Sequence, residues 1–422
     1  MKTRLLVVTL VLAMIFSVGV VQAADFGGKT VNFICWYNPL GHFQEGGLYE
    51  GRLEEAEKKF NVQIEFLPTT WADAEQFYMT RLISGDSAND VWIAGNKHFW
   101  PLVAQNALYA MDDLHSAGHY ESLPVERQKA VDAFSYKGSQ YGFGAFGNNL
   151  YSFMMVGVNK DLLEREGITD IYEIVENGEW TWDKFTEVAK AVTKDTDGDG
   201  ETDQWGYHRM IEIQWPFTNG ADYVKFKDGK PVFSLGEPEG IAALNQMLEW
   251  NMSGIIGGGE EGWAAGKVAM LVGEVWRVDA VRENLEFDYG FIPLPKGPAA
   301  DDYVYPVSSL EMLTLPANAE DPEGITELVE FLFRPEEWEE GIQQSIMTLA
   351  QDRETAGFLM QALLDWGGEN PAFDGILGPT WDWGWPMGRA IGAAVTGEKP
   401  ASVAMDEVAQ EVQAKLDEVF GE

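Results

Sequence analysis

The sequence contains a single cysteine, Cys35, among its 422 residues. One thiol cannot close an intramolecular disulfide, so no covalent cross-link of its own holds the fold together. Cys35 continues the apolar run Val31-Asn32-Phe33-Ile34 and does not directly follow a leader segment, which excludes the lipid attachment site of a lipoprotein. We therefore expect Cys35 to lie in the core of a strand.

Long hydrophobic runs are missing after the first 23 residues. No later stretch approaches the run of about 18 apolar residues that indicates a membrane-spanning helix. The first 23 residues themselves have the features of a secretory signal: basic Lys2 and Arg4, an apolar core over 5–21, and the small-residue cleavage site Val21-Gln22-Ala23. A retained membrane anchor is the alternative, but the run is short and ends in small residues. We expect cleavage, no lipid anchor, and a periplasmic or secreted mature chain.

Basic side chains are scarce, because 29 lysines and arginines stand against 68 aspartates and glutamates. Loss of Lys2 and Arg4 with the signal leaves 27 basic against 68 acidic side chains, a net charge of −41. Such a field repels nucleic acids and anionic membrane surfaces, which excludes both as partners. A cationic ligand or a saline habitat would suit the charge, but a solvated, repulsive surface that keeps an exported protein soluble explains it more simply.

Length and hydrophobic pattern favour an α/β fold with two lobes. A chain of 422 residues is too long for one ordinary core. In the first quarter of the chain, expected strands alternate with expected helices, which is typical of β-α-β units in a doubly wound sheet. The expected strands cover 31–36, 62–66 and 90–94, and the expected helices cover 47–60, 74–84 and 99–105.

The run from 158 to 207 ends in an acidic loop in which carboxylates alternate with other residues. Alternate side-chain oxygens on a glycine-containing turn can converge on a hard cation, as in the first half of an EF-hand calcium loop. The twelfth loop position, which should carry a bidentate glutamate, is Gly206, so the pattern departs from an EF-hand. A structural Ca²⁺ site and a solvated acidic turn both remain open. The candidate metal ligands are Asp195, Asp197, Asp199, Glu201 and Asp203.

Six segments give the chain a more specific character, and their order carries more information than any one of them. They are RLISGDSANDVW (81–92), NALYAMDDL (106–114), YKGSQYGFG (136–144), VNKDL through TWDKF to KDTDGDGETDQWG (158–206), GWAAGKVAMLVGEVW (262–276) and YGFIPLPKGP (289–298). In this order they resemble the extracellular solute-binding proteins of bacterial ABC importers, in the sugar-binding, maltose-binding-protein-like family. Gly144 is a departure, because the family often has proline there.

The resemblance implies a two-lobe periplasmic-binding-protein fold, with a doubly wound sheet flanked by helices in each lobe and a ligand cleft between them. The N-terminal lobe would comprise 24–144 and 289–345, and the C-terminal lobe 145–288 and 346–422. A carbohydrate ligand, expected to be an oligosaccharide, would be delivered to the permease subunits of an ABC importer after hinge closure. No bond is made or broken, no cofactor is required, and we expect a monomer.

Aromatic side chains are the main candidates for ligand contact, because indole faces stack on sugar rings while nearby polar groups bind hydroxyls. The loops after the first and third expected strands lie where open α/β sheets bind ligands. The resemblance adds an aromatic after the GKVAM segment and a Trp-Pro pair. A tryptophan-rich loop near the carboxyl terminus would be aggregation-prone if it were uncovered, and a ligand or the opposite lobe could cover it. The candidate ligand contacts are Trp36, Tyr37, Asn38, His42, Asn96, Trp100, Asn148, Trp215, Trp276, Arg277, Trp381, Trp383, Trp385 and Arg389.

Two alternatives stay open. A secreted, calcium-dependent glycoside hydrolase or polysaccharide lyase would also be rich in tryptophan, and abundant carboxylates could supply the pair that hydrolysis needs. The order of the motifs argues against it, and the appearance of new reducing ends would establish it. The same fold could instead bind a non-sugar solute such as a polyamine, a peptide or a phosphodiester, which a thermal-shift screen would reveal.

Overall fold

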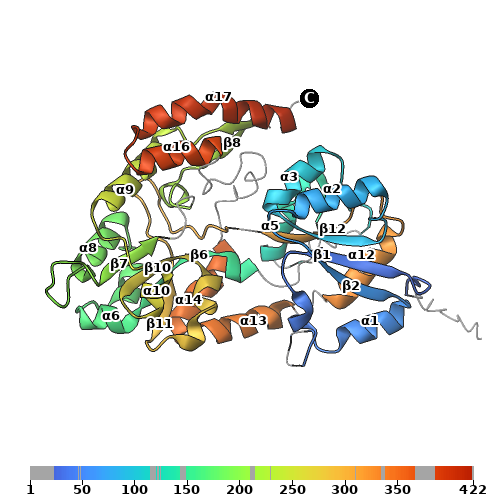
Figure 1. Ribbon diagram of the computed structural model, residues 1–422, viewed down its shortest axis with the longest axis horizontal. Coiled ribbons are helices and arrows are strands. Elements are labelled where there is room, and N and C mark those ends of the chain that lie inside the picture. The colour runs from blue at the N-terminus through green and yellow to red at the C-terminus, as the bar shows by residue number, and fades with distance from the viewer. Residues whose placement is uncertain are drawn as a thin grey trace, which may run out of the picture.

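The computed structural model describes residues 23–420, apart from 46, 48, 115–119, 121–122, 124, 143–148, 210–213, 229, 309, 334–337 and 366–384. The expected signal, residues 1–22, lies outside the described part. The described chain forms two lobes, each built around a four-stranded sheet with helices packed against it (Figure 1). No helix within these residues is long and apolar enough to cross a membrane.

The first sheet has the strand order β12-β3-β1-β2. β1 pairs in parallel with β2 and β3, whereas β12 runs antiparallel to β3. Side chains alternate across the central strand β3, so that Val91 and Ile93 join one core and Trp92 and Ala94 join the other. Both faces of the sheet are therefore buried under helices. The strands are β1 (Thr30–Cys35), β2 (Gln63–Pro68), β3 (Asp90–Gly95) and β12 (Glu311–Thr314).

Helices α1 and α12 pack against each other and cover one face, while α2 and α3 contribute to the core on the other face. α1 begins at Arg52 rather than at the expected 47, because Gly51 before it takes a left-handed φ of 73° that a helix cannot contain. Elements of this part of the chain are η1 (Pro39–His42), α1 (Arg52–Phe60), α2 (Ala74–Ser84), α3 (Asn96–Ala104), α5 (Val125–Ala133), β4 (Ser135–Tyr136), β5 (Ser139–Gln140) and α12 (Pro322–Leu332).

The second sheet has the order β11-β6-β10-β7 and is mixed, because β6 runs antiparallel to both β10 and β11. The sequence placed the return to the first lobe at residue 289, but Tyr289–Ile292 forms β11 and pairs with β6. The return therefore lies between β11 and β12. A short buried strand looks the same in either sheet, so the sequence could not show which partner it takes. The strands are β6 (Met154–Asn159), β7 (Trp205–Arg209), β10 (Val268–Glu274) and β11.

The remaining elements surround the second sheet or connect the lobes. A hairpin of two short strands and the helices α9, α16 and α17 form a layer at one end of this lobe (Figure 1). These elements are η2 (Asn149–Ser152), α6 (Lys160–Arg165), α7 (Ile171–Glu176), α8 (Trp182–Val192), η3 (Phe217–Asn219), β8 (Val224–Lys227), β9 (Lys230–Phe233), α9 (Pro238–Met252), α10 (Gly259–Ala264), α11 (Val275–Asp279), η4 (Arg282–Asn284), α13 (Trp338–Leu349), α14 (Arg353–Asp365), α16 (Pro386–Val395) and α17 (Ala401–Phe420).

The carboxyl end of α17 leaves the second lobe and reaches the first. The ring of Phe420 lies 4.8 Å from that of Trp100 on α3 and 5.7 Å from that of Tyr136 on β4. The Tyr136 hydroxyl also donates a hydrogen bond of 3.1 Å to the carbonyl of Val419. On its other side, Phe420 lies 6.2 Å from Phe226 of β8. A small aromatic cluster thus joins the two lobes.

Candidate functional site

Three aromatic rings meet at the carboxyl edge of the first sheet. Trp36 follows β1, Trp71 follows β2, and His98 lies in the first turn of α3 after β3. The rings of Trp36 and Trp71 are 4.6 Å apart and nearly perpendicular, and His98 lies 5.2 Å from the first and 4.6 Å from the second. Carboxyl ends of parallel strands gather at one edge, so loops far apart in sequence build one surface here. The sequence predicted Trp36, whereas it missed Trp71.

His98 fixes the position of Trp71. It is fully buried, and burial lowers its pKa to about 4, so the imidazole is neutral. The backbone N–H of Gly95 donates to Nδ1 at 3.2 Å, which leaves Nε2 to donate to the Trp71 carbonyl at 2.9 Å. A Cβ on Gly95 would lie 2.3 Å from the Trp71 ring, so only glycine allows this approach. The ring surface is therefore preformed.

A partly buried carboxyl lies at the same edge. Glu311 begins β12 and pairs with Gly95 at the end of β3, and its side chain is hydrogen-bonded to that of Tyr37. Burial raises the pKa of Glu311 to about 7 and also raises that of Tyr37. Sequence reasoning included Tyr37 but missed Glu311, because a glutamate at the start of a short strand gives no signal of its partners. Cys35 lies in the core beside this pair, as expected, and its thiol donates to the Tyr37 carbonyl at 2.9 Å.

Other first-lobe candidates have structural roles in the described contacts. The Asn38 side chain accepts from the backbone of Leu40 and caps η1. His42 ends η1, and burial lowers its pKa. Asn96 begins α3, but its side chain lies outside the description. The structure does not favour the predicted ligand contact of Trp100, because only 6% of this residue is exposed and its ring packs in the aromatic cluster that joins the lobes.

In the second lobe, Trp276 lies just past the carboxyl end of β10, and 44% of it is exposed. Arg277 stacks on this indole with its guanidinium carbon 4.4 Å from the ring centre. The same guanidinium binds Glu274 at 2.5 Å and Glu260 at 2.8 Å. The ion pairs hold Arg277 in place, so the arginine orients Trp276, and the predicted ligand contact of Trp276 stays a prediction that this exposed face supports.

Trp385 stands before the first turn of α16 and is 41% exposed. Lys415 of α17 lies 4.9 Å from its ring centre. Arg389, one turn further on, lines a groove of about 440 Å³ between α16 and α17. Trp381 and Trp383 of the same tryptophan-rich loop lie outside the described residues, and so does Asn148.

The prediction for Trp215 is wrong for the structure described here. Only 1% of this residue is exposed, and its ring packs 4.6 Å from Trp250 and 5.6 Å from Phe185. Residues of α8 and α9 therefore enclose this indole in the structure. The Trp-Pro pair marks the start of η3 inside the core rather than the surface of the lobe.

The acidic loop brings three of its five predicted metal ligands together. Carboxylate oxygens of Asp195, Asp197 and Asp199 lie within 4.8 Å of one another. Asp203 instead accepts from the hydroxyl and backbone N–H of Thr196, at 2.6 and 2.8 Å, and Glu201 does not join the group. Two backbone N–H groups donate to Asp195, which lowers its pKa.

Gly206 explains why the calcium pattern stops early. A Cβ at this position would lie 2.5 Å from the backbone carbonyl of Ala189, because β7 passes directly against α8. The position where an EF-hand would carry a glutamate therefore requires glycine, because any side chain there would prevent β7 from packing against α8.

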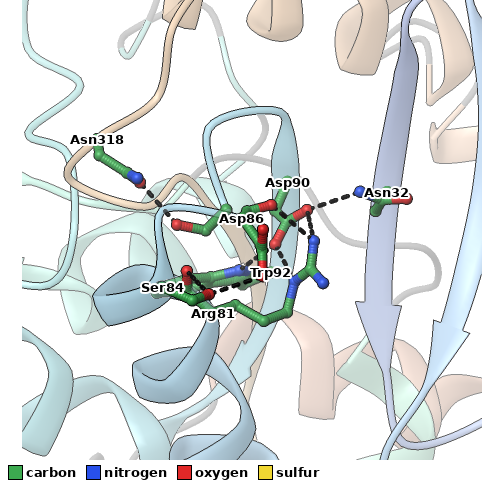
Figure 2. Close-up of polar contacts among 8 residues, drawn as sticks. Asn32, Arg81, Ser84, Asp86, Asp90, Trp92 and Asn318 are labelled. Carbon is green, nitrogen blue, oxygen red and sulfur yellow. Dashed lines mark hydrogen bonds and ion pairs between the residues drawn. The ribbon is translucent and has the colours of Figure 1, made fainter.

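The amino edge of the same first sheet is built differently (Figure 2). The Asp90 carboxylate is fully buried and accepts from Arg81 at 2.6 and 2.8 Å and from Asn32 at 2.9 Å. Nearby, Ser87 bonds to Asn318 at 2.7 Å and ties the segment after β12 to this edge. The RLISGDSANDVW segment thus supplies a structural network, and it lies at the opposite end of β3 from the ring cluster.

A family model described as bacterial extracellular solute-binding protein matches residues 52–357. Among solved structures, the chain is similar to a cyclo/maltodextrin-binding protein complexed with maltotetraose, at 16% identity and a TM-score of 0.68, over 93% of this chain and 98% of that one. It is also similar to the GacH receptor of Streptomyces glaucescens, unliganded or with acarbose, at 16% identity and a TM-score of 0.67, over 92% and 99%. UgpB from Mycobacterium tuberculosis, in complex with glycerophosphocholine, matches at 16% identity and a TM-score of 0.65, over 92% and 98%. These likenesses confirm the predicted two-lobe fold.

Proposed function

The chain belongs to the family of bacterial extracellular solute-binding proteins, and we propose that it captures an oligosaccharide and delivers it to the permease subunits of an ABC importer. One observation carries the choice of ligand: the preformed surface of Trp36, Trp71 and His98 at the carboxyl edge of the first sheet. Aromatic faces stack on the C–H faces of a sugar ring, and the partly buried carboxyl of Glu311 beside them can bind a hydroxyl.

The second lobe supplies the opposing surfaces in this proposal. Trp276 and Trp385 are the two tryptophans with large exposed faces among the described residues of that lobe. Hinge bending would bring the lobes, 24–144 with the segment after β11 and 145–292 with 346–422, together over the sugar. The ligands of the similar structures support a saccharide in two cases, maltotetraose and acarbose, whereas glycerophosphocholine shows that the fold also accepts a phosphodiester.

The proposal includes a mature, monomeric binding protein that makes and breaks no bond. Cleavage after Ala23 would release the chain from its leader. Mass spectrometry of the exported protein would test that cleavage, and light scattering would test the monomer. Incubation with candidate oligosaccharides should give no new reducing ends, and any sustained turnover would establish the enzyme alternative instead.

A ligand screen tests the central claim. Thermal shift and calorimetry with maltotetraose, mannotriose and glycerophosphocholine would compare the main ligand classes. A specific ligand at 100 times its Kd should stabilise the protein by about 2.7 kcal/mol. We expect a saccharide to produce this shift and Trp71→Ala to reduce it to about a third at the same ligand concentration. A shift with glycerophosphocholine and with no saccharide would overturn the sugar assignment.

We also propose that Asp195, Asp197 and Asp199 hold a structural Ca²⁺ that stiffens the loop between α8 and β7. Three converging carboxylates fit a hard cation, and water would supply its remaining ligands. Chelation should lower the melting temperature of the protein, and Asp199→Asn should remove this effect. Glu201→Gln removes the same charge from the same loop and should keep it. If chelation changes nothing and elemental analysis finds no calcium, the loop is a solvated turn.

A further inference from the structure

A groove of about 1000 Å³ opens on the second lobe, and none of the candidate ligand or metal residues above lines it. Its walls come from α7, the 302–305 segment and α14. Three aromatic rings line it: Tyr303, Tyr305 and Phe358. The Tyr303 hydroxyl accepts from the backbone of Trp180 at 3.1 Å and donates to the carbonyl of Val175 at 3.0 Å. These bonds hold the wall in place, so the groove is preformed.

Tyr305 is the residue that points to a ligand. Only 3% of its surface is exposed, yet its hydroxyl has no hydrogen-bond partner among the residues that the structure describes. This hydroxyl is not one of the fully enclosed polar atoms without a partner, so it opens into the groove that Tyr305 lines. A donor inside the groove would satisfy it.

The charges on the rim select the class of ligand. Four carboxylates line the groove against one guanidinium, that of Arg353, so anions are disfavoured. Convergent carboxylates that could share one metal ion occur, within the described part of the chain, only in the 195–199 loop. The rim acids are therefore spread out and suit a ligand whose positive charges are spaced along a chain. They are Glu176, Asp302, Glu354 and Asp365.

We propose that this groove is a second binding site, for an extended organic cation that carries primary ammonium groups. Each ammonium group donates to carboxylates, and one donates to the Tyr305 hydroxyl, while the aromatic walls hold the methylene chain and attract the cation through their π faces. The site is separate from the saccharide surface, so either one can exist without the other.

Spermidine is the probe, and calorimetry on the full mature protein at fixed salt is the measurement. Gly357→Leu is the most informative variant, because Gly357 lines the groove and a Cβ there would have no atom within 4 Å. The leucine should block the groove without changing charge and reduce spermidine affinity at least tenfold. Tyr305→Phe should reduce it about threefold to tenfold through loss of one charged hydrogen bond. Circular dichroism and the melting temperature confirm that each variant folds.

A charge-matched pair separates this groove from the acidic surface as a whole. Glu354→Gln with Asp365→Asn removes two charges from the groove and should weaken spermidine binding at least tenfold. Glu407→Gln with Glu411→Gln removes two charges from the groove between α16 and α17 and should leave the affinity within twofold. Equal weakening by both pairs, or no binding of spermidine to the parent protein, overturns the proposal. Competition by maltotetraose with no effect of Gly357→Leu would place spermidine in the saccharide site and overturn it too.

Discussion

At the amino edge of the first sheet, polar side chains bind one another; at its carboxyl edge, aromatic rings and one partly buried carboxyl meet instead. Asp90 has three strong donors from Arg81 and Asn32 around a carboxylate with no exposed surface (Figure 2). Glu311, at the other end of the same strand pair, has a raised pKa because burial removes its carboxyl from water, and the hydrogen bond with Tyr37 offsets this only in part.

This difference separates residues that stabilise the lobe from candidate binding residues within one sheet. A fully paired carboxylate has nothing left to offer a ligand, so the amino edge holds the lobe together. A carboxyl with spare lone pairs beside partly buried rings is costly to the fold, and such a cost is typical of a site that another molecule completes. The next four experiments test this contrast, from the largest expected effect to the smallest.

Asp90→Ala should lower the free energy of unfolding by about 3 kcal/mol, because it leaves the Arg81 guanidinium, only 19% exposed, without its partner. Urea unfolding measures the loss. Saccharide affinity of the folded fraction should stay within twofold. A loss below 1 kcal/mol would mean that the network at the amino edge is dispensable, and the contrast would fail.

Trp71→Ala should reduce saccharide affinity about 30-fold, the equivalent of about 2 kcal/mol, by removing the ring that Trp36 and His98 support. Calorimetry with maltotetraose, or with the saccharide that the screen identifies, measures it. The control is Trp92→Phe, a fully buried tryptophan of β3 that stacks on Tyr78 at 4.8 Å. It should lower stability and leave affinity unchanged. The reverse result would assign binding to another surface.

Glu311→Gln should change how stability depends on pH. The pKa of Glu311 is raised from 4.5 to about 7 in the folded protein, so folding favours the protonated form. Its contribution to the free energy of unfolding is fully present below pH 4.5 and is lost as the pH rises through 7. We expect the loss to be on the order of 1–2 kcal/mol. The difference in the free energy of unfolding between pH 5 and pH 8 should therefore be smaller for Glu311→Gln than for the parent protein. The same pH dependence in both proteins would show that folding does not raise the pKa of Glu311.

Glu320→Gln should have the smallest effect. Its ion pair with Lys29 is 2.9 Å long, but both side chains are more than half exposed. Exposed pairs contribute up to about 1 kcal/mol, and salt screens them. Urea unfolding at low and high salt would measure it, and a loss as large as that of Asp90→Ala would show that burial does not explain the strength of the amino edge.

Much of the fold could be predicted from the sequence, because periodicity is a local property. Strands over 31–36 and 90–94 were predicted within one residue of β1 and β3. The motif order predicted the family, which the match over 52–357 shows. Strand partners are not local, and so the sequence placed 289–292 in the first lobe although it completes the second sheet.

The candidate site was harder to predict for the same reason. Position after a strand correctly drew attention to Trp36, but the same argument included Trp100, which a turn of α3 rotates into the core. Trp71 offered one signal that could have been used, an isolated indole in the polar stretch after β2. Glu311 offered none, since its role comes from Gly95 and Tyr37, hundreds of residues away in sequence.

The strand order of the first sheet bears on how the nascent chain folds. β3 ends at Gly95, and its neighbour β12 begins only at Glu311. Until that point has been synthesised, β1, β2 and β3 present an unpaired edge that can recruit another strand, and closing so long a loop is slow. No single cut in the gene can therefore release the first lobe as a complete unit. Because β12 also carries Glu311, the proposed sugar-binding edge is finished only after residue 311 has been synthesised.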